Sequence, residues 1–432
     1  MLLLSLSLLL CGLPFLAVAQ ATSLPQSVAD KFGAKCLDGS PPTYQITRNA
    51  SSDGWVLFLE GGGWCYGATA NETLQSCADR GGMIWPPKAK ASANNNNKKQ
   101  QEYKTDGDIG GIMSQNCTLN PHFCSWNKVF LHYCDGASFG GGRVEPIATT
   151  AKKGGAPGQM WMRGRNNFNA LISYLQTDLG MGDATEVILS GGSAGALAVF
   201  YNLDHLATLL PATTRLVGFP DAGFFLDAQS TAGTYDYRNS FIGADPVWNV
   251  TGSGGTNLKC LAANAGAEWK CLMAPYLAPF ISTPYFVLNS AHDMWQLMNI
   301  LKQSCIPTPT NPCTAAENRT IRTYQQDFVA AIKAVAANNP KNGYYVDSCY
   351  VHEQNVNYCS SQGLPNCVGY TPYETGSKKW GYTTELGTPS GALGMTPQQA
   401  FNEWYLTATT VQAIDSYTFF DNPSCHYLGN PV

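Results

Sequence analysis

Residues Thr185–Val199 read TEVILSGGSAGALAV and decide the fold of this 432-residue chain. The apolar, β-branched run before the glycines predicts a buried strand, and the small apolar residues after them predict a packed helix. Between the two lies Gly-x-Ser-x-Gly, Gly191–Gly195, with Ser193 at its centre. A strand, this pentapeptide and a helix in that order are typical of a sharp turn that exposes a nucleophilic serine. The alternative is a glycine-rich turn with an incidental serine.

Apolar runs alternate with helical patterns on both sides of this stretch. We expect strands at residues 55–60, 128–133, 215–219, 285–288 and 343–346, the last of them final in the chain, and helices at 162–179 and 324–339. Such alternation predicts an α/β fold with a mostly parallel central sheet flanked by helices. With the serine turn, the class is α/β-hydrolase-like with long, disulfide-stapled loop insertions, of which the polar stretch 88–104 is one.

The N-terminus has the pattern of a signal peptide. Residues 1–19 are almost wholly apolar and end in Ala-Val-Ala, a small-x-small cleavage pattern. A membrane anchor is the alternative, but no charged stop-transfer flank follows. No later segment approaches the roughly 18 apolar residues of a membrane span. We therefore expect no membrane span, a single domain over residues 20–432, and secretion to the extracellular space or cell wall.

Cysteine usage agrees with an oxidising compartment. Of 15 cysteines, Cys11 lies in the leader, so an even number remains for disulfides. No Cys-x-x-Cys pair is present, so we expect no zinc or other metal site. Five Asn-x-Ser/Thr sequons predict a glycoprotein, at Asn49, Asn71, Asn116, Asn249 and Asn318. Close pairs predict local loop staples: Cys65/Cys77, Cys117/Cys124, Cys260/Cys271, Cys305/Cys313 and Cys359/Cys367.

A nucleophilic serine needs a base, and this fold class orders its triad as serine, acid, histidine along the chain. Four histidines follow Ser193. His205 falls on the helix after the turn, His292 is the chain neighbour of a candidate acid, and His426 lies in the C-terminal tail. His352 follows a strand end among polar neighbours, and we favour it. The alternative for His352 is a loop histidine with a local hydrogen bond.

The acid that orients the base also follows a strand. Asp293 comes just after the strand at 285–288, and Asp221 just after the strand at 215–219. We favour Asp293, since Asp221 also fits a capping residue of a turn.

An oxyanion hole needs backbone N–H groups that point to one place. Ala194, directly after the serine, is the expected first donor, and the glycines at 61–63 follow an early strand as in HGGG-type loops.

Seven motifs together resemble the pectin acetylesterase family, which also contains the animal Wnt-deacylating carboxylesterase Notum. The resemblance implies Ser193 as nucleophile, Asp293 as acid and His352 as base, with Gly62, Gly63 and Ala194 as the oxyanion hole. The motifs are LEGGGWC at 59–65, WNKV at 126–129 with YCDG at 133–136, Arg163-Gly164, the turn at 191–195, DAGFF at 221–225, NSAHDMWQ at 289–296, and Ser348-Cys349 with His352.

Two departures from the family pattern concern residues beside the site. Plant members usually read Gly-Cys-Ser-Ala-Gly-Gly, whereas Gly192 and Ala196 stand here in place of the cysteine and the last glycine. The family's His-Cys-Gln reads His352-Glu353-Gln354, which alters the disulfide set. The residues expected to carry the chemistry survive both changes.

The resemblance implies a serine carboxylesterase that removes O-acetyl groups from a pectin-like polysaccharide and needs no cofactor. Trp64 and Tyr66 beside the glycine loop are candidates to stack on sugar rings, or equally core aromatics. We expect a monomer, and the net charge of −4 with 13% charged residues indicates no nucleic-acid partner. Hydrolysis of a fatty-acyl ester, as by Notum on an acylated protein, is one alternative. A catalytically inactive binding protein of the same fold is the other.

Overall fold

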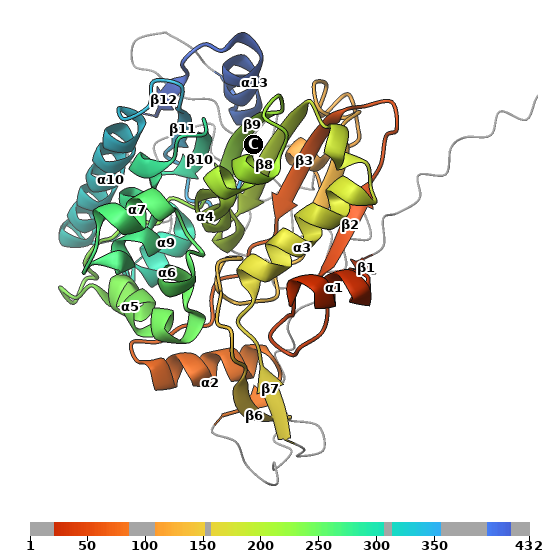
Figure 1. Cartoon of the computed structure of the whole chain (residues 1–432). Coiled ribbons are helices and arrows are strands. Elements are labelled where there is room, and N and C mark those ends of the chain that lie inside the picture. Colours follow the sequence, from red (N-terminus) through yellow and green to blue (C-terminus); the bar gives the residue numbers. More distant parts are fainter. Residues whose placement is uncertain (1–20, 86–108, 152–156, 306–312, 356–394, 416–432) are drawn as a thin grey trace, which may run out of the picture.

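The computed structural model describes residues 21–85, 109–151, 157–305, 313–355 and 395–415. One nine-stranded sheet runs through these residues (Figure 1). Its strands are β1 (Thr22–Ser23), β2 (Thr43–Thr47), β3 (Gly54–Leu59), β5 (Asn127–Leu131), β8 (Glu186–Gly192), β9 (Arg215–Asp221), β10 (Phe286–Ser290), β11 (Gly343–Asp347) and β12 (Gln412–Ile414).

The strand order is β1-β2-β5-β3-β8-β9-β10-β11-β12. From β5 to β12 all neighbours are parallel, whereas β1 pairs antiparallel with β2 and β2 with β5. The predicted mostly parallel sheet is therefore confirmed. A small antiparallel sheet joins β4 (Met83–Ile84), β6 (Ile147–Ala151) and β7 (Pro157–Met160).

Helices cover both faces of the large sheet. The α-helices in the described part of the chain are α1 (Gln26–Phe32), α2 (Ala70–Arg80), α3 (Gly164–Thr177), α4 (Ala194–Leu209), α5 (Asp236–Trp248), α6 (Val250–Ser253), α7 (Leu258–Ala263), α8 (Ala274–Leu277), α9 (Met294–Asn299), α10 (Ala315–Ala336) and α13 (Pro397–Thr407). Short 3-10 turns occupy Gly111–Met113, Met181–Asp183, Glu268–Leu272 and Ala278–Phe280.

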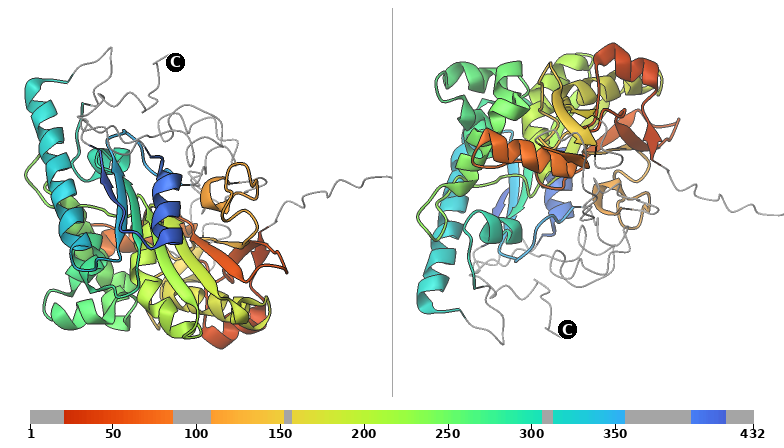
Figure 2. Two further views of the ribbon diagram at one scale, coloured as in Figure 1. Left: turned by 90° about the horizontal axis from the view of Figure 1, so that it is seen from above. Right: turned by 90° about the horizontal axis from the view of Figure 1, so that it is seen from below.

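Alternate residues of the central strand β8 enter two separate cores. Val187 and Leu189 belong to the core that includes residues of α3, α4 and α10, whereas Ile188 belongs to the second core, with Phe219 and with Phe401 of α13. Because successive strand side chains point to opposite faces, an apolar run such as β8 needs both faces covered. Figure 2 shows this cover, with α13 on one side of the strands and α1 and α3 on the other.

The expected strands and helices are found, with two differences in bounds or order, and several elements that the sequence did not predict, α13 among them, are added. α10 begins at Ala315, nine residues before the expected start, because Thr314 and Glu317 form a capping box that starts it earlier. The strand at 343–346 is not the last, since β12 pairs parallel with β11. α13, which the sequence did not predict, covers one sheet face.

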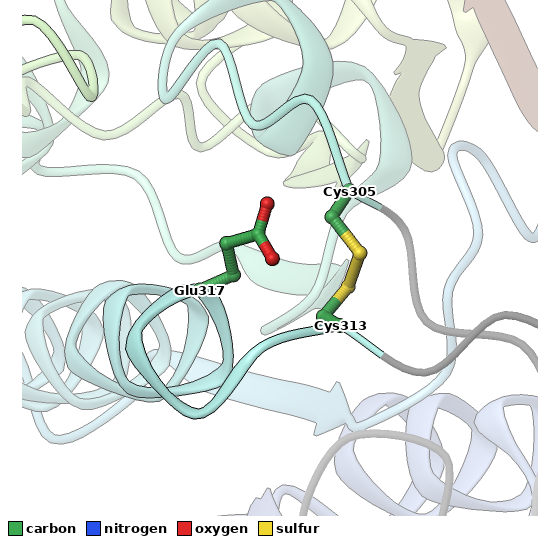
Figure 3. Close-up of side chains that lie close together, drawn as sticks. All are labelled: Cys305, Cys313 and Glu317. Carbon is green, nitrogen blue, oxygen red and sulfur yellow. A yellow bond between two sulfur atoms is a disulfide. The ribbon is translucent and has the colours of Figure 1, made fainter.

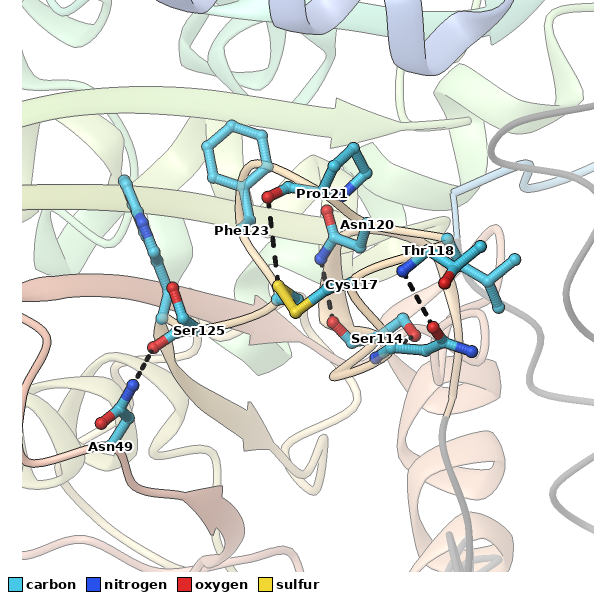
Figure 4. Close-up of a disulfide and its surroundings, with 12 residues drawn as sticks. Asn49, Ser114, Cys117, Thr118, Asn120, Pro121, Phe123 and Ser125 are labelled. Atoms are coloured by element: carbon cyan, nitrogen blue, oxygen red, sulfur yellow. Dashed lines mark hydrogen bonds between the residues drawn. A yellow bond between two sulfur atoms is a disulfide. The ribbon is translucent and has the colours of Figure 1, made fainter.

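Four predicted local disulfides are confirmed: Cys65–Cys77, Cys117–Cys124, Cys260–Cys271 and Cys305–Cys313. Figure 4 shows the Cys117–Cys124 staple, beside which the sequon residue Asn49 donates from Nδ2 to the carbonyl of Ser125 at 2.7 Å. The structure adds Cys36–Cys134, which links segments 98 residues apart.

Some predictions fall on residues that the structure does not describe. The signal peptide at 1–19, the polar loop at 88–104, the pair Cys359/Cys367 and His426 are among them. Of the helices that are described, none is long and apolar enough to cross a membrane.

Candidate active site

Ser193 lies at the turn from β8 into α4, at the carboxyl edge of the sheet. Its backbone has φ 53° and ψ −121°, a conformation that non-glycine residues rarely adopt. The flanking glycines are required by close packing, because a Cβ on Gly191 would lie 2.5 Å from the carbonyl oxygen of Gly195, and one on Gly195 would lie 2.1 Å from that of Leu59. The predicted strained serine turn is therefore present.

The structure brings His352 and Asp293 to Ser193. Nε2 of His352 lies 2.8 Å from Oγ of Ser193, and Nδ1 lies 2.8 Å from Oδ2 of Asp293. His352 follows β11, and Asp293 is the N-cap of α9, where its Oδ1 accepts from the backbone N–H of Gln296. All three side chains are buried, with Ser193 6% and His352 8% exposed. With Nδ1 donating to the carboxylate, Nε2 is left to accept the serine proton.

Two opposing effects act on the imidazole of His352. Burial lowers its pKa, and the adjacent carboxylate of Asp293 raises it; the net pKa lies above the usual value for histidine. The charged imidazolium is therefore well stabilised at this place, as a base that takes up a proton during a reaction requires.

Asp221, the competing acid, has a different position. Its Oδ2 accepts backbone N–H groups of Gln354 and Asn355 at 2.7 and 2.6 Å, and its backbone carbonyl accepts from the N–H of Ser193 at 2.9 Å. Burial raises the pKa of Asp221 to about 6. Asp221 thus ties the turn at Ser193 to the loop that carries His352.

The other described histidines that follow Ser193 in the chain point elsewhere. Nδ1 of His292 lies 3.0 Å from the carbonyl of Ser348, and burial lowers the pKa of this histidine to about 4. Nε2 of His205, on α4, lies 2.7 Å from Oδ1 of Asn169.

The loop Gly61–Gly63 packs directly against the serine turn. A Cβ on Gly61 would lie 2.5 Å from the carbonyl oxygen of Gly192 and 3.0 Å from Cβ of Ser193. Gly62 and Gly63 have φ of 117° and 67°, which favour glycine. Arg80, at the end of α2, donates from Nη1 to the carbonyl of Gly62 at 2.9 Å and so fixes the orientation of that peptide. Sequence reasoning missed Arg80, whose role depends on a contact across 18 residues.

An aromatic cluster forms one wall beside His352. Trp64 lies at its centre, with Phe225, Phe241 and Trp295 edge-on at ring-centroid distances of 5.0 to 5.5 Å. The rings of Phe225 and Trp295 each lie 6.3 Å from that of His352. Trp64 is only 6% exposed, so it has no open face on which a sugar ring stacks. Of the two roles expected for it, the structure favours a core aromatic. The neighbouring Tyr66 is partly exposed.

One group of possible metal-ligating atoms occurs among the described residues, and it contains none of the three residues Ser193, His352 and Asp293. Cys305, Cys313 and Glu317 place such atoms within 4.8 Å of one another (Figure 3). The two sulfurs are joined as a disulfide, which leaves no thiolate to bind zinc. Glu317 accepts hydrogen bonds from the backbone and hydroxyl of Thr314. The group is therefore a disulfide beside a helix-capping glutamate at the start of α10.

Known pectin acetylesterases resemble this chain over most of its length. Residues 18–426 match the profile of the pectinacetylesterase family. Pectin acetylesterase 11 of Arabidopsis thaliana is 29% identical over 418 residues, 94% of this chain and 92% of the relative. Pectin acetylesterase 7 of the same plant is 31% identical over 356 residues, 79% of this chain and 82% of the relative.

Notum proteins are more distant relatives. The palmitoleoyl-protein carboxylesterase NOTUM of Schmidtea mediterranea is 26% identical over 279 residues, 61% of this chain and 47% of that protein. The solved structure of the Wnt deacylase Notum from Drosophila superposes with a TM-score of 0.68 at 20% identity, over 94% of this chain and 99% of that one, which shows the shared fold. The resemblance predicted from the motifs is confirmed: this chain belongs to the pectinacetylesterase family and is a carboxylic ester hydrolase.

Proposed function

We propose that this chain is a secreted serine carboxylesterase that removes O-acetyl groups from pectin or a related cell-wall polysaccharide. Ser193 is the nucleophile, His352 the base and Asp293 the acid that orients it. The observation that carries this proposal is the pair of 2.8 Å contacts joining the three side chains in one line at the carboxyl edge of the sheet.

The reaction follows from these contacts. Nε2 of His352 accepts the hydroxyl proton as Oγ of Ser193 attacks the acetyl carbon, and the carbonyl oxygen becomes an anion held by backbone N–H groups of Gly62, Gly63 and Ala194. The bond to the sugar oxygen then breaks, and His352 returns the proton to that oxygen, which leaves an acetylated serine. Water then loses a proton to the same imidazole as it attacks the acetyl carbon. The bond from that carbon to Oγ of Ser193 breaks, the imidazolium returns the proton to Oγ, and acetic acid departs.

Two observations support acetyl as the acyl group. The pectin acetylesterases match over most of their own length, whereas the chain spans about half of the planarian Notum relative. The buried aromatic cluster around Trp64 also fills the space beside His352 with large rings. Tyr66, partly exposed next to this cluster, is the candidate sugar contact.

The secreted state is part of the proposal. Five disulfides among the described residues suit an oxidising compartment. The sequon residues Asn71, Asn116 and Asn318 are exposed, which glycosylation requires. We infer a glycosylated monomer that acts without a metal or cofactor.

The test is a comparison of acyl-chain lengths on the full secreted protein, with p-nitrophenyl esters from acetyl to palmitoyl beside acetylated pectin. We expect acetate release from pectin and rates that fall steeply beyond short chains. Ser193→Ala, the control, should lose at least about 10⁴-fold in kcat with an unchanged Tm. A preference for long chains would instead support a Notum-like lipid ester hydrolase, and no hydrolysis of any ester a binding protein.

A further inference from the structure

The loop after β5 holds a strained serine between the two halves of the site. This loop, residues 134–141, reads CDGASFGG and contains part of the YCDG motif, to which the proposed reaction assigns no role. Ser138 and Phe139 have φ of 52° and 53°, and Ser138 is 1% exposed. Non-glycine residues in this region persist only where their surroundings hold them, and they cluster at functional sites.

The hydroxyl of Ser138 bridges two segments that meet at Ser193. It accepts the indole N–H of Trp64 at 2.7 Å and donates to the backbone carbonyl of Ala194 at 2.7 Å. Trp64 directly follows Gly63, and Ala194 directly follows Ser193. One buried hydroxyl therefore connects the glycine loop after β3 to the first turn of α4.

The rest of the loop holds Ser138 in place. The carboxylate of Asp135 accepts from the backbone N–H groups of Phe139 and Gly141 at 3.1 and 3.2 Å. The N–H of Ser138 donates to the hydroxyl of Tyr133 at 2.9 Å. A Cβ on Gly164 would lie 1.9 Å from Oδ2 of Asp135, which explains the glycine of the Arg163-Gly164 motif.

The loop also contacts the glycine segment through its backbone. The N–H of Cys65 donates to the carbonyl of Gly136 at 3.0 Å, one residue beyond Trp64. The loop and the glycine segment are thus joined at two successive residues, by one backbone and one side-chain hydrogen bond.

An oxyanion hole works only if its donors hold a fixed separation while negative charge develops. Here the donors come from segments about 130 residues apart in the chain, Gly62–Gly63 and Ala194. We propose that Ser138 is a positioning residue that fixes these two donor segments relative to each other. The inference rests on the proposed function, because it takes Ser193 as the nucleophile.

The test compares two substitutions that remove the hydroxyl but differ in backbone strain. Ser138→Ala keeps a Cβ at positive φ, whereas Ser138→Gly relieves that strain. We expect both variants to lose about 10- to 100-fold in kcat on p-nitrophenyl acetate, with KM changed less than about twofold, short of the loss for a deleted donor. We also expect a higher Tm for the glycine variant. If kcat instead followed Tm, so that the more stable of the two variants was also the more active one, the inference would be overturned.

A fluorophosphonate probe gives a readout that does not depend on the natural substrate. Its phosphoryl oxygen takes the place of the carbonyl oxygen, so the labelling rate of Ser193 should fall by the same factor as kcat in both Ser138 variants. Ser230→Ala is the control, because Ser230 is a buried serine whose hydroxyl contacts Thr234 and Asp236, neither of which belongs to the proposed site. Its labelling rate should equal that of the wild type.

The outcomes separate the two proposals. A wild type that labels, with Ser138 variants that label equally fast, overturns the role of Ser138 and leaves the proposed function intact. A wild type that neither labels nor hydrolyses any ester overturns the proposed function, and the inference with it.

A double variant tests whether the bridge acts as a unit. Trp64→Phe removes the indole donor and keeps an aromatic ring. If the hydroxyl acts through the contacts described, Trp64→Phe combined with Ser138→Ala should be no slower than the slower single variant. Losses that multiply would show that the two residues act independently and would contradict the bridge.

Discussion

Asp221 ends β9 and Asp293 follows β10, and their contacts distinguish the two carboxylates. The sequence favoured Asp293 as the residue that orients the base, with Asp221 as the competitor, since both lie at strand ends on the same edge of the sheet. The structure places Oδ2 of Asp293 on His352 and Oδ2 of Asp221 on the backbone of the next loop. The direction of each side chain depends on the course of its loop, which no local pattern in the chain encodes.

Replacing Asp293 by asparagine should change both the rate and its pH dependence. The carboxylate raises the pKa of His352, so its loss lowers that pKa. Because the base acts in its neutral form, the acid limb of the kcat/KM profile should move to lower pH. The rate at its maximum should fall by about 10⁴-fold, since an amide does not stabilise the imidazolium or fix the same tautomer.

The measurement is a pH–rate profile with p-nitrophenyl acetate for wild type and Asp293→Asn. His205→Gln serves as the control, because His205, in the last turns of α4, contacts Asn169 of α3 and should leave the profile unchanged. If the acid limb of Asp293→Asn lay at the same pH as that of the wild type, a group other than His352 would set that limb.

Residues that act through contacts across the chain were the ones that sequence reasoning missed. Arg80 holds the carbonyl of Gly62, and Ser138 joins Trp64 to Ala194. Arginine at a helix end and serine in a loop are common, so only the motif around Ser138, not its role, was visible in the chain.

Among the elements, the buried strands were predictable and the outer cover was not. Strands such as β3 and β8 are continuous apolar runs because helices cover both faces of the sheet. The apolar residues of α13 that are buried, Ala400, Phe401, Trp404 and Tyr405, lie at helical spacing but span fewer than two turns. β12 is only three residues long, so both elements give short signals. Their places are set by the sheet that they cover and extend.

α13 should nevertheless contribute strongly to stability. Phe401 is fully buried, and its ring stacks on Phe219 of β9 at 4.1 Å between centroids. Phe401→Ala should lower the free energy of unfolding by about 3–5 kcal/mol, because it leaves a cavity between helix and sheet. Leu406→Ala on the same helix removes a half-exposed side chain and should change stability by less than about 0.5 kcal/mol.

Denaturant unfolding followed by fluorescence or circular dichroism measures both variants. If both substitutions changed the free energy of unfolding by equally small amounts, α13 would not unfold together with the rest of the domain. A large effect for Leu406→Ala would show that the helix packs differently on the sheet.

Across the whole molecule, buried carboxyl groups make the free energy of unfolding depend on pH. Burial raises the pKa of Asp135 and Asp221 to about 6 and that of Asp347 to about 7. Each group therefore binds a proton more tightly folded than unfolded, and its contribution to stability is lost as pH rises from about 4 through its folded pKa. Burial lowers the pKa of His205 and His292 to about 4, which has the opposite effect below about pH 6.5.

Above pH 6.5 the lowered pKa values of the two histidines no longer oppose the effect of the raised pKa values on stability. His205 and His292 are neutral in both states there, whereas the raised pKa of His352 means that the folded protein still holds a proton that the unfolded chain has released. The stability that this proton contributes is fully present below about pH 6.5 and is lost as pH rises through the raised pKa. The Tm should therefore fall between pH 6.5 and pH 9, while ester hydrolysis rises over the same interval because the base becomes neutral.

Thermal unfolding of the full secreted protein at pH 6.5 and pH 9 tests this opposition. His352→Gln cannot hold the proton, so it should lose most of the fall in Tm that the wild type shows. His205→Gln, which keeps the pair of His352 and Asp293, should show the same fall as the wild type. A wild-type Tm that rises toward pH 9, or an equal fall in His352→Gln, would contradict this assignment. If the assignment holds, the charge pair that stabilises the fold in acid is the one that must lose its proton for catalysis.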